Sequence, residues 1–116
     1  MVKKNLMRFD EGERDIVYRA VSEAKDNLDE LGVNSDDHFN VLDKLYFAPI
    51  KRSVFGGKKY IVYMDYEEKM LTLKSVTAFR ARVMNEGVYD DAALTKLICD
   101  IAFAPCRRYN PDKVME

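Results

Sequence analysis

Residues 53–65 read SVFGGKKYIVYMD, and this stretch decides the predicted fold. Its two glycines supply the positive φ angles that a tight turn requires, and they separate two segments rich in β-branched and aromatic residues. A second turn at residues 66–69 would lead into another strand at residues 70–74. We therefore predict a basic three-stranded antiparallel meander over residues 50–74, with one face covered by helices.

Residues 10–47 are predicted to form an acidic helical hairpin. The apolar residues between positions 10 and 33 recur at spacings of three and four, the period of an amphipathic helix. They are Val17, Val21, Ala24, Leu28 and Leu31. Gly32 is suited to the left-handed cap that ends this helix. Residues 34–37 can cap a second helix over residues 38–47, whose inward residues would be Phe39, Leu42, Leu45 and Tyr46.

Two further helices are predicted over residues 76–104. Ser75 or Thr77 would cap the first, Asp90 would cap the second, and Pro105 stops the second. We interpret residues 1–9 as an N-terminal arm and residues 105–116 as a loose tail. The chain is therefore expected to be a single α+β domain of order ααβββαα.

Two short stretches of the chain resemble each other. Residues 45–52 (LYFAPIKR) and 101–108 (IAFAPCRR) both end a predicted helix in Phe-Ala-Pro, followed by one apolar and two basic residues. A duplicated helix terminus would explain the match. We expect instead that it reflects only the shared chemistry of helix stops.

The composition excludes several classes of protein. The 116 residues are 47% hydrophobic and 34% charged, as in a compact domain and unlike a disordered chain. No apolar run approaches the ~20 residues that span a bilayer, and no secretory signal is present, so we expect a cytoplasmic protein without a membrane partner. With one His in the chain, Cys99 and Cys106 cannot complete a four-ligand zinc set. We expect both to be buried or half-buried free thiols, and we expect no cofactor.

Charge is distributed unevenly, although the net charge is only −1. Residues 10–43 carry eleven acidic and three basic residues, whereas residues 44–82 carry nine basic and three acidic ones. The oppositely charged parts could attract each other or simply face solvent. Alternatively, one of the two surfaces could meet a partner of opposite charge.

The leading hypothesis is a non-enzymatic regulator or inhibitor that binds a basic protein surface through the acidic hairpin. Its contact residues would be Glu13, Glu23, Asp26, Asp29 and Glu30. One version follows the analogy of phage-type anti-defence (anti-CRISPR-like) inhibitors and mimics the charge of nucleic acid on a nucleic-acid enzyme. The apolar face of the sheet could also bind a second copy of the chain.

The alternative is a small nucleic-acid-binding module built on the basic hairpin. Cations that contact phosphates are interleaved there with Tyr60, Tyr63 and Tyr66, whose rings could stack on bases. Alternation along the strand places Tyr60 and Tyr63 on opposite faces, so the tyrosines do not form one platform. The predicted phosphate contacts are Lys51, Arg52, Lys58, Lys59, Arg80 and Arg82.

A third hypothesis, a small metal-dependent hydrolase, has little support. His38 follows two aspartates at a helix start, where the carboxylates already serve as caps. Residues 67–69 (EEK) match only the tail of a nuclease motif and fall in a predicted turn. We therefore predict neither a catalytic residue nor a metal site.

Overall fold

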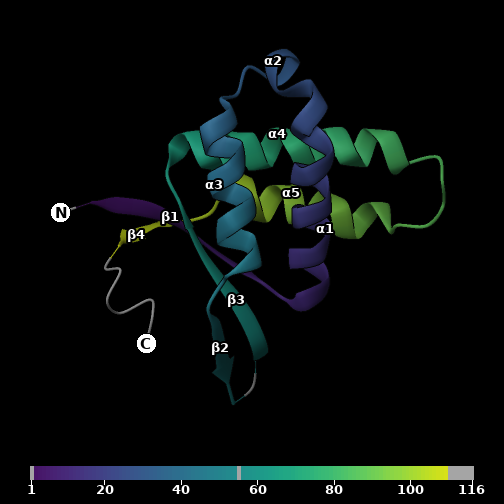
Figure 1. The fold of residues 1–116 in the computed structure, drawn as a ribbon. Coiled ribbons are helices and arrows are strands. Elements are labelled where there is room, and N and C mark those ends of the chain that lie inside the picture. The colour runs from purple at the N-terminus through teal and green to yellow at the C-terminus, as the bar shows by residue number, and fades with distance from the viewer. Residues whose placement is uncertain (1, 55, 110–116) are drawn as a thin grey trace.

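In the computed structural model, which describes residues 2–54 and 56–109, helices pack against one antiparallel sheet (Figure 1). The strands are β1 (Lys3–Phe9), β2 (Ile50–Ser53), β3 (Gly57–Met64) and β4 (Cys106–Arg108), in the order β2-β3-β1-β4 across the sheet. The helices are α1 (Glu11–Glu23), the 3-10 helix η1 (Ala24–Asn27), α2 (Leu28–Leu31), α3 (Ser35–Tyr46), α4 (Tyr66–Val83) and α5 (Asp91–Ala102). The predicted α+β class is confirmed.

The predicted order of elements is wrong in three places. Residues 1–9, expected to be an arm, contain the central strand β1. Residues 66–74, expected to form a turn and a third meander strand, are the first turns of α4. Residues 106–108 of the expected loose tail form β4, and residues 110–116 lie outside the described part of the chain. The domain therefore has a four-stranded sheet instead of a three-stranded meander.

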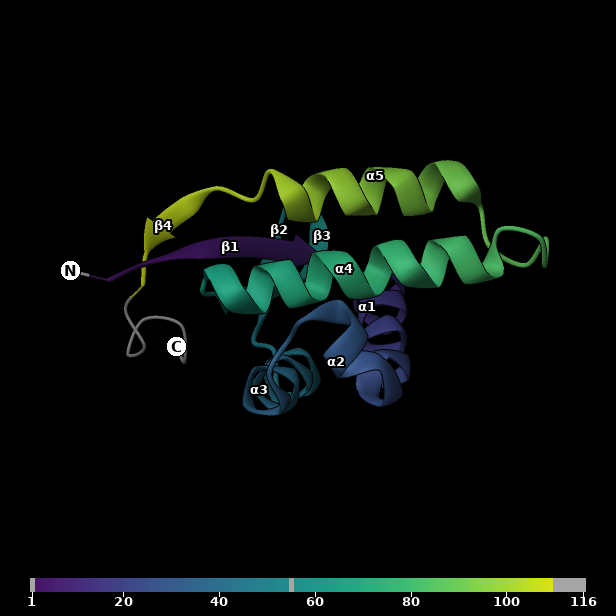
Figure 2. The ribbon, with the colours of Figure 1, turned by 90° about the horizontal axis from the view of Figure 1, so that it is seen from above.

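Helix α4 lies at the centre of the helical layer, and its position explains why the sequence pattern was misleading. It packs against α1, α3 and α5 (Figure 2), so its buried residues occupy much of its circumference and do not form a single stripe. Asp65 caps this helix, since its Oδ1 accepts a hydrogen bond from the Glu68 N–H at 2.8 Å. Ser75 and Thr77, the expected caps, lie inside α4.

Several local signals are confirmed. The predicted helix over residues 10–33 divides into α1, η1 and α2, and Gly32 ends it at φ +69°. Asn34 caps α3 and Asp90 caps α5, each through a side-chain oxygen that accepts backbone N–H groups. Among the residues that the structure describes, no helix has the length and apolar character needed to cross a membrane.

Helix α3 presents a partly different face to the core than the sequence predicted: Leu42 and Leu45 pack there as expected, whereas two other predicted residues do not. His38 and Val41 are buried beside Leu45. Phe39 and Tyr46, expected to face inward, are 68% and 63% exposed. The helix is therefore rotated relative to the prediction.

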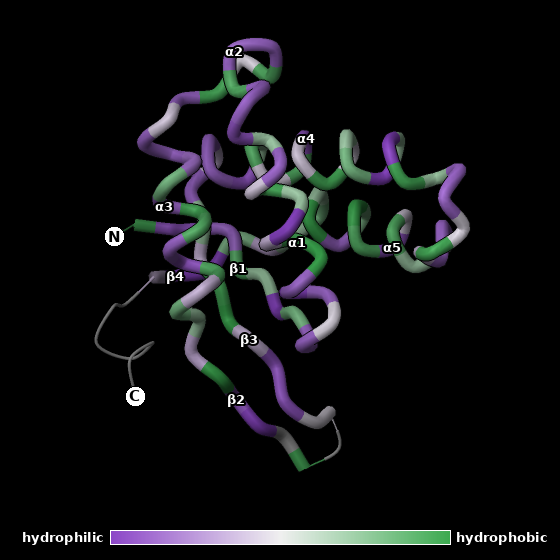
Figure 3. The backbone as a smooth tube through the Cα atoms, turned by 45° about the vertical axis from the view of Figure 1, so that its right-hand side comes forward, coloured by the Kyte–Doolittle hydropathy of each residue, from purple (hydrophilic) through white to green (hydrophobic). Residues whose placement is uncertain are grey.

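The predicted hairpin is present as β2 and β3, and it extends away from the helices (Figure 1). Its last register pair is Ser53↔Gly57, so Gly57 belongs to β3 and the predicted turn of two glycines is wrong. Gly57 has φ +69°, a left-handed conformation that favours glycine. Both strands of the hairpin contain hydrophilic segments (Figure 3).

The chain folds as two structural repeats. Strand, helix, helix and strand succeed one another as β1–α1–α3–β2 and again as β3–α4–α5–β4. The first repeat begins KKNLMRFDEGE at residue 3, and the second begins KKYIVYMDYEE at residue 58, so residues 55 positions apart correspond. The central strands end in corresponding aspartates, Asp10 and Asp65, and each forms a capping box with a Glu three residues later.

The ends of the repeats also correspond. The Phe C-caps of α3 and α5 have nearly the same backbone angles, φ −100° and −105° with ψ 19° in both. Beyond them, the carbonyl oxygens of Pro49 and Pro105 accept hydrogen bonds from the N–H groups of Ile61 and Leu6, at 2.9 and 2.8 Å. Residues 45–52 and 101–108 are therefore equivalent parts of two repeats, and the expectation of a coincidental match is wrong.

The sheet joins the repeats around a local two-fold axis. In the pair Asn5↔Met64, the counterparts of the two residues are Tyr60 and Phe9, and these two also pair with each other. In the pair Met7↔Val62, each residue is the counterpart of the other, so the pair maps onto itself. At the ends of the repeats the corresponding positions are 56 apart, and with this offset the pairs between β2 and β3 map onto those between β4 and β1. Each central strand thus lies between two strands of the other repeat.

The two faces of the sheet differ in character, because successive strand residues point to opposite faces. One face supplies apolar side chains to the core that the sheet shares with the helices: Met7, Phe9, Val62 and Met64. The opposite face carries five cations beside Leu6, Ile61 and Tyr63. These cations are Lys4, Arg8, Lys51, Lys59 and Arg107.

Candidate nucleic-acid interface

The four strands contain nine basic residues and no acidic residue. The basic residues are Lys3, Lys4, Arg8, Lys51, Arg52, Lys58, Lys59, Arg107 and Arg108. Within residues 2–54 and 56–109, every ion pair joins side chains outside the strands, so none of these nine cations has a carboxylate partner. Their charges add to a positive potential over the sheet.

On the hairpin, the cations lie opposite one another. Lys51 pairs with Lys59 and Arg52 pairs with Lys58 in the register of β2 and β3. Like charges directly opposite in an antiparallel pair are destabilising, by roughly the 0.2–1 kcal/mol that opposite charges contribute favourably. This arrangement therefore destabilises the hairpin of the free protein.

The tyrosines of β3 are occupied by contacts within the fold. The Tyr60 ring is only 7% exposed, with the Arg14 guanidinium carbon 4.6 Å and Lys58 Nζ 5.2 Å from its centroid. Tyr63 is half-buried, and its ring centroid lies 5.2 Å from that of Tyr109. Tyr66 belongs to α4 and does not extend the strand. These three tyrosines therefore do not form a platform on which bases could stack.

Arg80 is not part of the hairpin surface with which it was predicted. It lies in the C-terminal half of α4, where its Nε and Nη2 donate to the two carboxylate oxygens of Asp91 at 2.8 and 3.1 Å. These hydrogen bonds hold the pKa of Arg80 above its ordinary value and the pKa of Asp91 below its own. Arg80 is thus engaged in holding α4 to α5.

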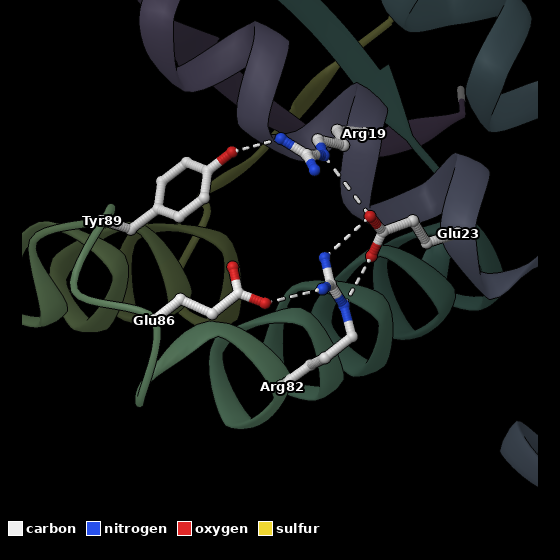
Figure 4. Close-up of polar contacts among 5 residues, drawn as sticks. All are labelled: Arg19, Glu23, Arg82, Glu86 and Tyr89. Atoms are coloured by element: carbon white, nitrogen blue, oxygen red, sulfur yellow. Dashed lines mark hydrogen bonds and ion pairs between the residues drawn. The ribbon is translucent and has the colours of Figure 1, made fainter.

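Arg82 is likewise paired inside the fold, in the network of Figure 4. Its Nη2 and Nε donate to both carboxylate oxygens of Glu23, at 2.8 and 3.1 Å, and its Nη1 donates to Glu86 at 3.2 Å. Arg19 donates to Glu23 from the same helix and to Tyr89 Oη at 2.6 Å. Glu23, predicted as a partner contact, therefore joins α1 to α4.

The other predicted acidic contacts are separated from one another. Glu13 forms the capping box at the start of α1, where its Oε1 accepts the Asp10 N–H at 3.0 Å. Asp26, Asp29 and Glu30 are exposed beyond the other end of α1, in η1 and α2, and none of the three has an ion pair within the described residues. Of the five predicted acidic contacts, only Asp26, Asp29 and Glu30 thus have carboxylates that form neither an ion pair nor a helix cap in the described chain. We call these three residues the acidic tip.

The hydrolase hypothesis rested on His38 and on residues 67–69, of which Glu67 is exposed at the start of α4. His38 and Glu68 have structural partners. His38 is buried, and its Nε2 donates to the carbonyl oxygen of Val21 at 2.7 Å. Glu68 is buried at the start of α4, with Lys44 Nζ 2.7 Å from its carboxylate. In the part of the chain that the structure describes, no three or more His, Cys, Asp or Glu side chains are grouped so as to hold a metal ion.

The expectation for the cysteines is wrong, because both Cys99 and Cys106 are exposed. Leu97 and Ile101 occupy the buried face of α5, which turns Cys99 outward. Cys106 lies on the edge strand β4, where its Sγ donates to Asn5 Oδ1 at 3.6 Å.

Sequence reasoning missed the cations on β1 and β4. Lys3, Lys4, Arg107 and Arg108 lay in the supposed arm and tail. The signal that could have found them is the recurrence of Lys-Lys at the start of each central strand and of a basic pair one residue after each Phe-Ala-Pro. Comparisons with protein-family models, with curated proteins and with solved structures found no match.

Proposed function

We propose that the chain binds nucleic acid and that the β2–β3 hairpin contacts its phosphate backbone. The observation that carries the proposal is the pairing of cation with cation, Lys51 with Lys59 and Arg52 with Lys58, on a hairpin that extends from the domain. A polyanion supplies the counter-charge that the fold does not. We also propose that the protein is cytoplasmic, as expected from the sequence.

The chemistry of the hairpin favours positioning on the backbone over reading of the base sequence. Lysine and arginine contacts to phosphates are independent of sequence, whereas specific readout needs side chains that reach base edges. The sheet face opposite the core, on which Leu6 and Ile61 are buried, carries five cations. This charge disfavours the pairing of two copies through that face.

The test is the salt dependence of binding, measured by fluorescence anisotropy with a labelled duplex of about 24 base pairs in roughly 50–200 mM salt. Each phosphate contact contributes about −0.9 to the slope of log affinity against log salt. The variant Lys58→Ala/Lys59→Ala should therefore bind more weakly than the unmodified chain, with a slope shallower by about two.

The matched control is Arg80→Ala/Arg82→Ala, which removes the same charge from residues that are paired inside the fold. It should leave the slope unchanged. A flat salt curve for the unmodified chain, or equal losses in the two variants, would contradict the proposal.

The acidic tip supports a second candidate, the protein-binding regulator. Asp26, Asp29 and Glu30 are exposed and have no ion pair in the described chain, so their charge is available to a basic protein surface. The test is affinity capture from lysate with nuclease present. A stoichiometric protein that is lost on charge reversal of all three residues would support this candidate, and a protein retained by that variant would contradict it.

A further inference from the structure

The sheet carries a second set of cations at the end opposite to the hairpin. We propose that Lys3, Lys4, Arg107 and Arg108 form a second phosphate-binding cluster and that the chain holds one B-form DNA duplex with both clusters at once. This inference rests on the proposed function and specifies its ligand. We call these four residues the β1–β4 cluster, and Lys51, Arg52, Lys58 and Lys59 the hairpin cluster.

The two clusters are equivalent by the register of the sheet. Lys3 lies opposite Arg108 and Lys4 lies opposite Arg107, just as Lys58 lies opposite Arg52 and Lys59 opposite Lys51. Lys3, Arg107 and Arg108 are exposed, and Lys4 is half-buried, with its Nζ 4.4 Å from the centroid of the Tyr109 ring. The same unfavourable like-charge pairing therefore occurs at both ends of the sheet.

The symmetry of this array points to a double-stranded ligand. The local axis that exchanges the repeats passes through the Met7↔Val62 pair and runs perpendicular to the sheet, so both clusters present the same face. The antiparallel strands of a duplex are related by two-fold axes perpendicular to the helix, which is why two-fold symmetric proteins match symmetric sites on DNA. A single strand has a direction and no such axis.

The separation of the clusters sets the length of duplex that both can reach. Lys3 lies two strand residues beyond Asn5, which pairs with Met64, and Lys58 lies six residues before Met64, so the two lysines are eight residues apart along the strand direction. At about 3.4 Å per residue the separation is about 27 Å. A duplex rises 3.4 Å per base pair, so about eight base pairs span it. Arg8, which is exposed on the face opposite the core, lies between the two ends.

The shape of the hairpin favours DNA over double-stranded RNA. The major groove of B-form DNA is about 12 Å wide and admits a two-stranded β-ribbon. The major groove of A-form RNA is deep and narrow, and side chains cannot reach into it. A projecting ribbon with cations on both faces therefore fits the DNA groove.

The experiment compares two matched variants of the full chain, Lys3→Ala/Lys4→Ala and Lys58→Ala/Lys59→Ala, which alter corresponding positions of the two repeats. Binding to the duplex of about 24 base pairs should weaken similarly in both, with the salt slope shallower by about two in each. Urea unfolding and circular dichroism would verify that both variants are folded.

Duplex length provides the second measurement. The affinity of the unmodified chain should rise steeply as the duplex lengthens from about five to about ten base pairs. This rise should exceed the one that results merely because a longer duplex offers more positions at which the chain can bind. Lys3→Ala/Lys4→Ala should lose this rise, because only one cluster remains in contact.

The outcomes separate this inference from the proposed function. If the unmodified chain binds no nucleic acid, the proposed function fails. If Lys3→Ala/Lys4→Ala keeps the affinity and slope of the unmodified chain while Lys58→Ala/Lys59→Ala loses them, only the second cluster is refuted. Equal or tighter binding of a single strand or of an RNA duplex would overturn the assignment of duplex DNA.

Discussion

The basic residues of the helices and those of the sheet have opposite surroundings. Six helical cations lie within 2.7–3.3 Å of a carboxylate. They are Arg14, Arg19, Lys44, Arg80, Arg82 and Lys96. The strand cations have no such partner in the described chain, and eight of the nine lie opposite another cation. Whether a basic residue has a carboxylate partner therefore says more about its role than its charge alone does. Several helical cations connect elements of the fold, whereas the strand cations remain available to a ligand.

The largest effect on stability is expected where a helical cation has a buried partner. Lys44→Met would leave the Glu68 carboxylate, whose side chain is 3% exposed, without its counter-ion. Because Lys44 is partly exposed, we expect a loss of about 2–3 kcal/mol in the free energy of unfolding, somewhat less than for a fully buried pair. Urea unfolding at neutral pH measures it, and DNA affinity should not change.

The control for this variant is Lys96→Met, which breaks the exposed pair between Lys96 and Asp100. An exposed pair four residues apart on a helix contributes only about 0.3–0.5 kcal/mol. Equal losses in the two variants would show that burial of Glu68 does not govern the effect.

A smaller effect of opposite sign is expected on the sheet. Lys59→Glu replaces the repulsion with Lys51 by attraction, and should raise the free energy of unfolding by about 0.5 kcal/mol. The same change should weaken the proposed DNA binding, because it replaces a proposed phosphate contact by a negative charge. Lys59→Gln should lie between the unmodified chain and Lys59→Glu both in the free energy of unfolding and in DNA affinity. A Lys59→Glu variant that is less stable than the unmodified chain would contradict the contrast between sheet and helices.

The smallest effect concerns Asp37, in the first turn of α3. Burial and, after it, the nearby carboxylates of Asp65 and Glu68 raise its pKa above the ordinary 3.8. The native state therefore binds this proton more tightly than the unfolded chain, so stability falls as pH rises through this range and stays lower above it. Asp37→Asn should be slightly more stable than the unmodified chain at neutral pH, and the gain should vanish well below pH 3.8. Thermal unfolding across this range measures it, and a gain that persists in acid would contradict the assignment.

Local signals of the sequence predicted local structure. The caps Asn34 and Asp90, the left-handed Gly32 and the hairpin all appear in the fold, because each depends on residues that are neighbours in the chain. Strand β1 was missed because its partners β3 and β4 lie far along the sequence. Helix α4 was missed because it is buried on several sides and therefore has no single apolar stripe. Its Asp-x-x-Glu capping box was nevertheless present in the sequence.

The residues of the candidate site could likewise be predicted only where they are neighbours in the chain. The hairpin cations were identified from sequence because they flank one turn. The carboxylates that pair with Arg80 and Arg82 come from other helices, so sequence spacing could not show that these arginines are engaged. The β1–β4 cluster forms only when residues about a hundred positions apart become neighbours, which no local pattern reports.

The exchange of strands between the repeats has a consequence for the backbone connection between Ser53 and Gly57. A cut there would leave two fragments, each with a whole repeat and with a central strand whose two neighbours belong to the other fragment. Such fragments are expected to complement each other, and a single repeat alone would need a second copy to fill its sheet. The connection would then raise the effective concentration of one repeat for the other, and the chain is built like a dimer whose subunits were joined.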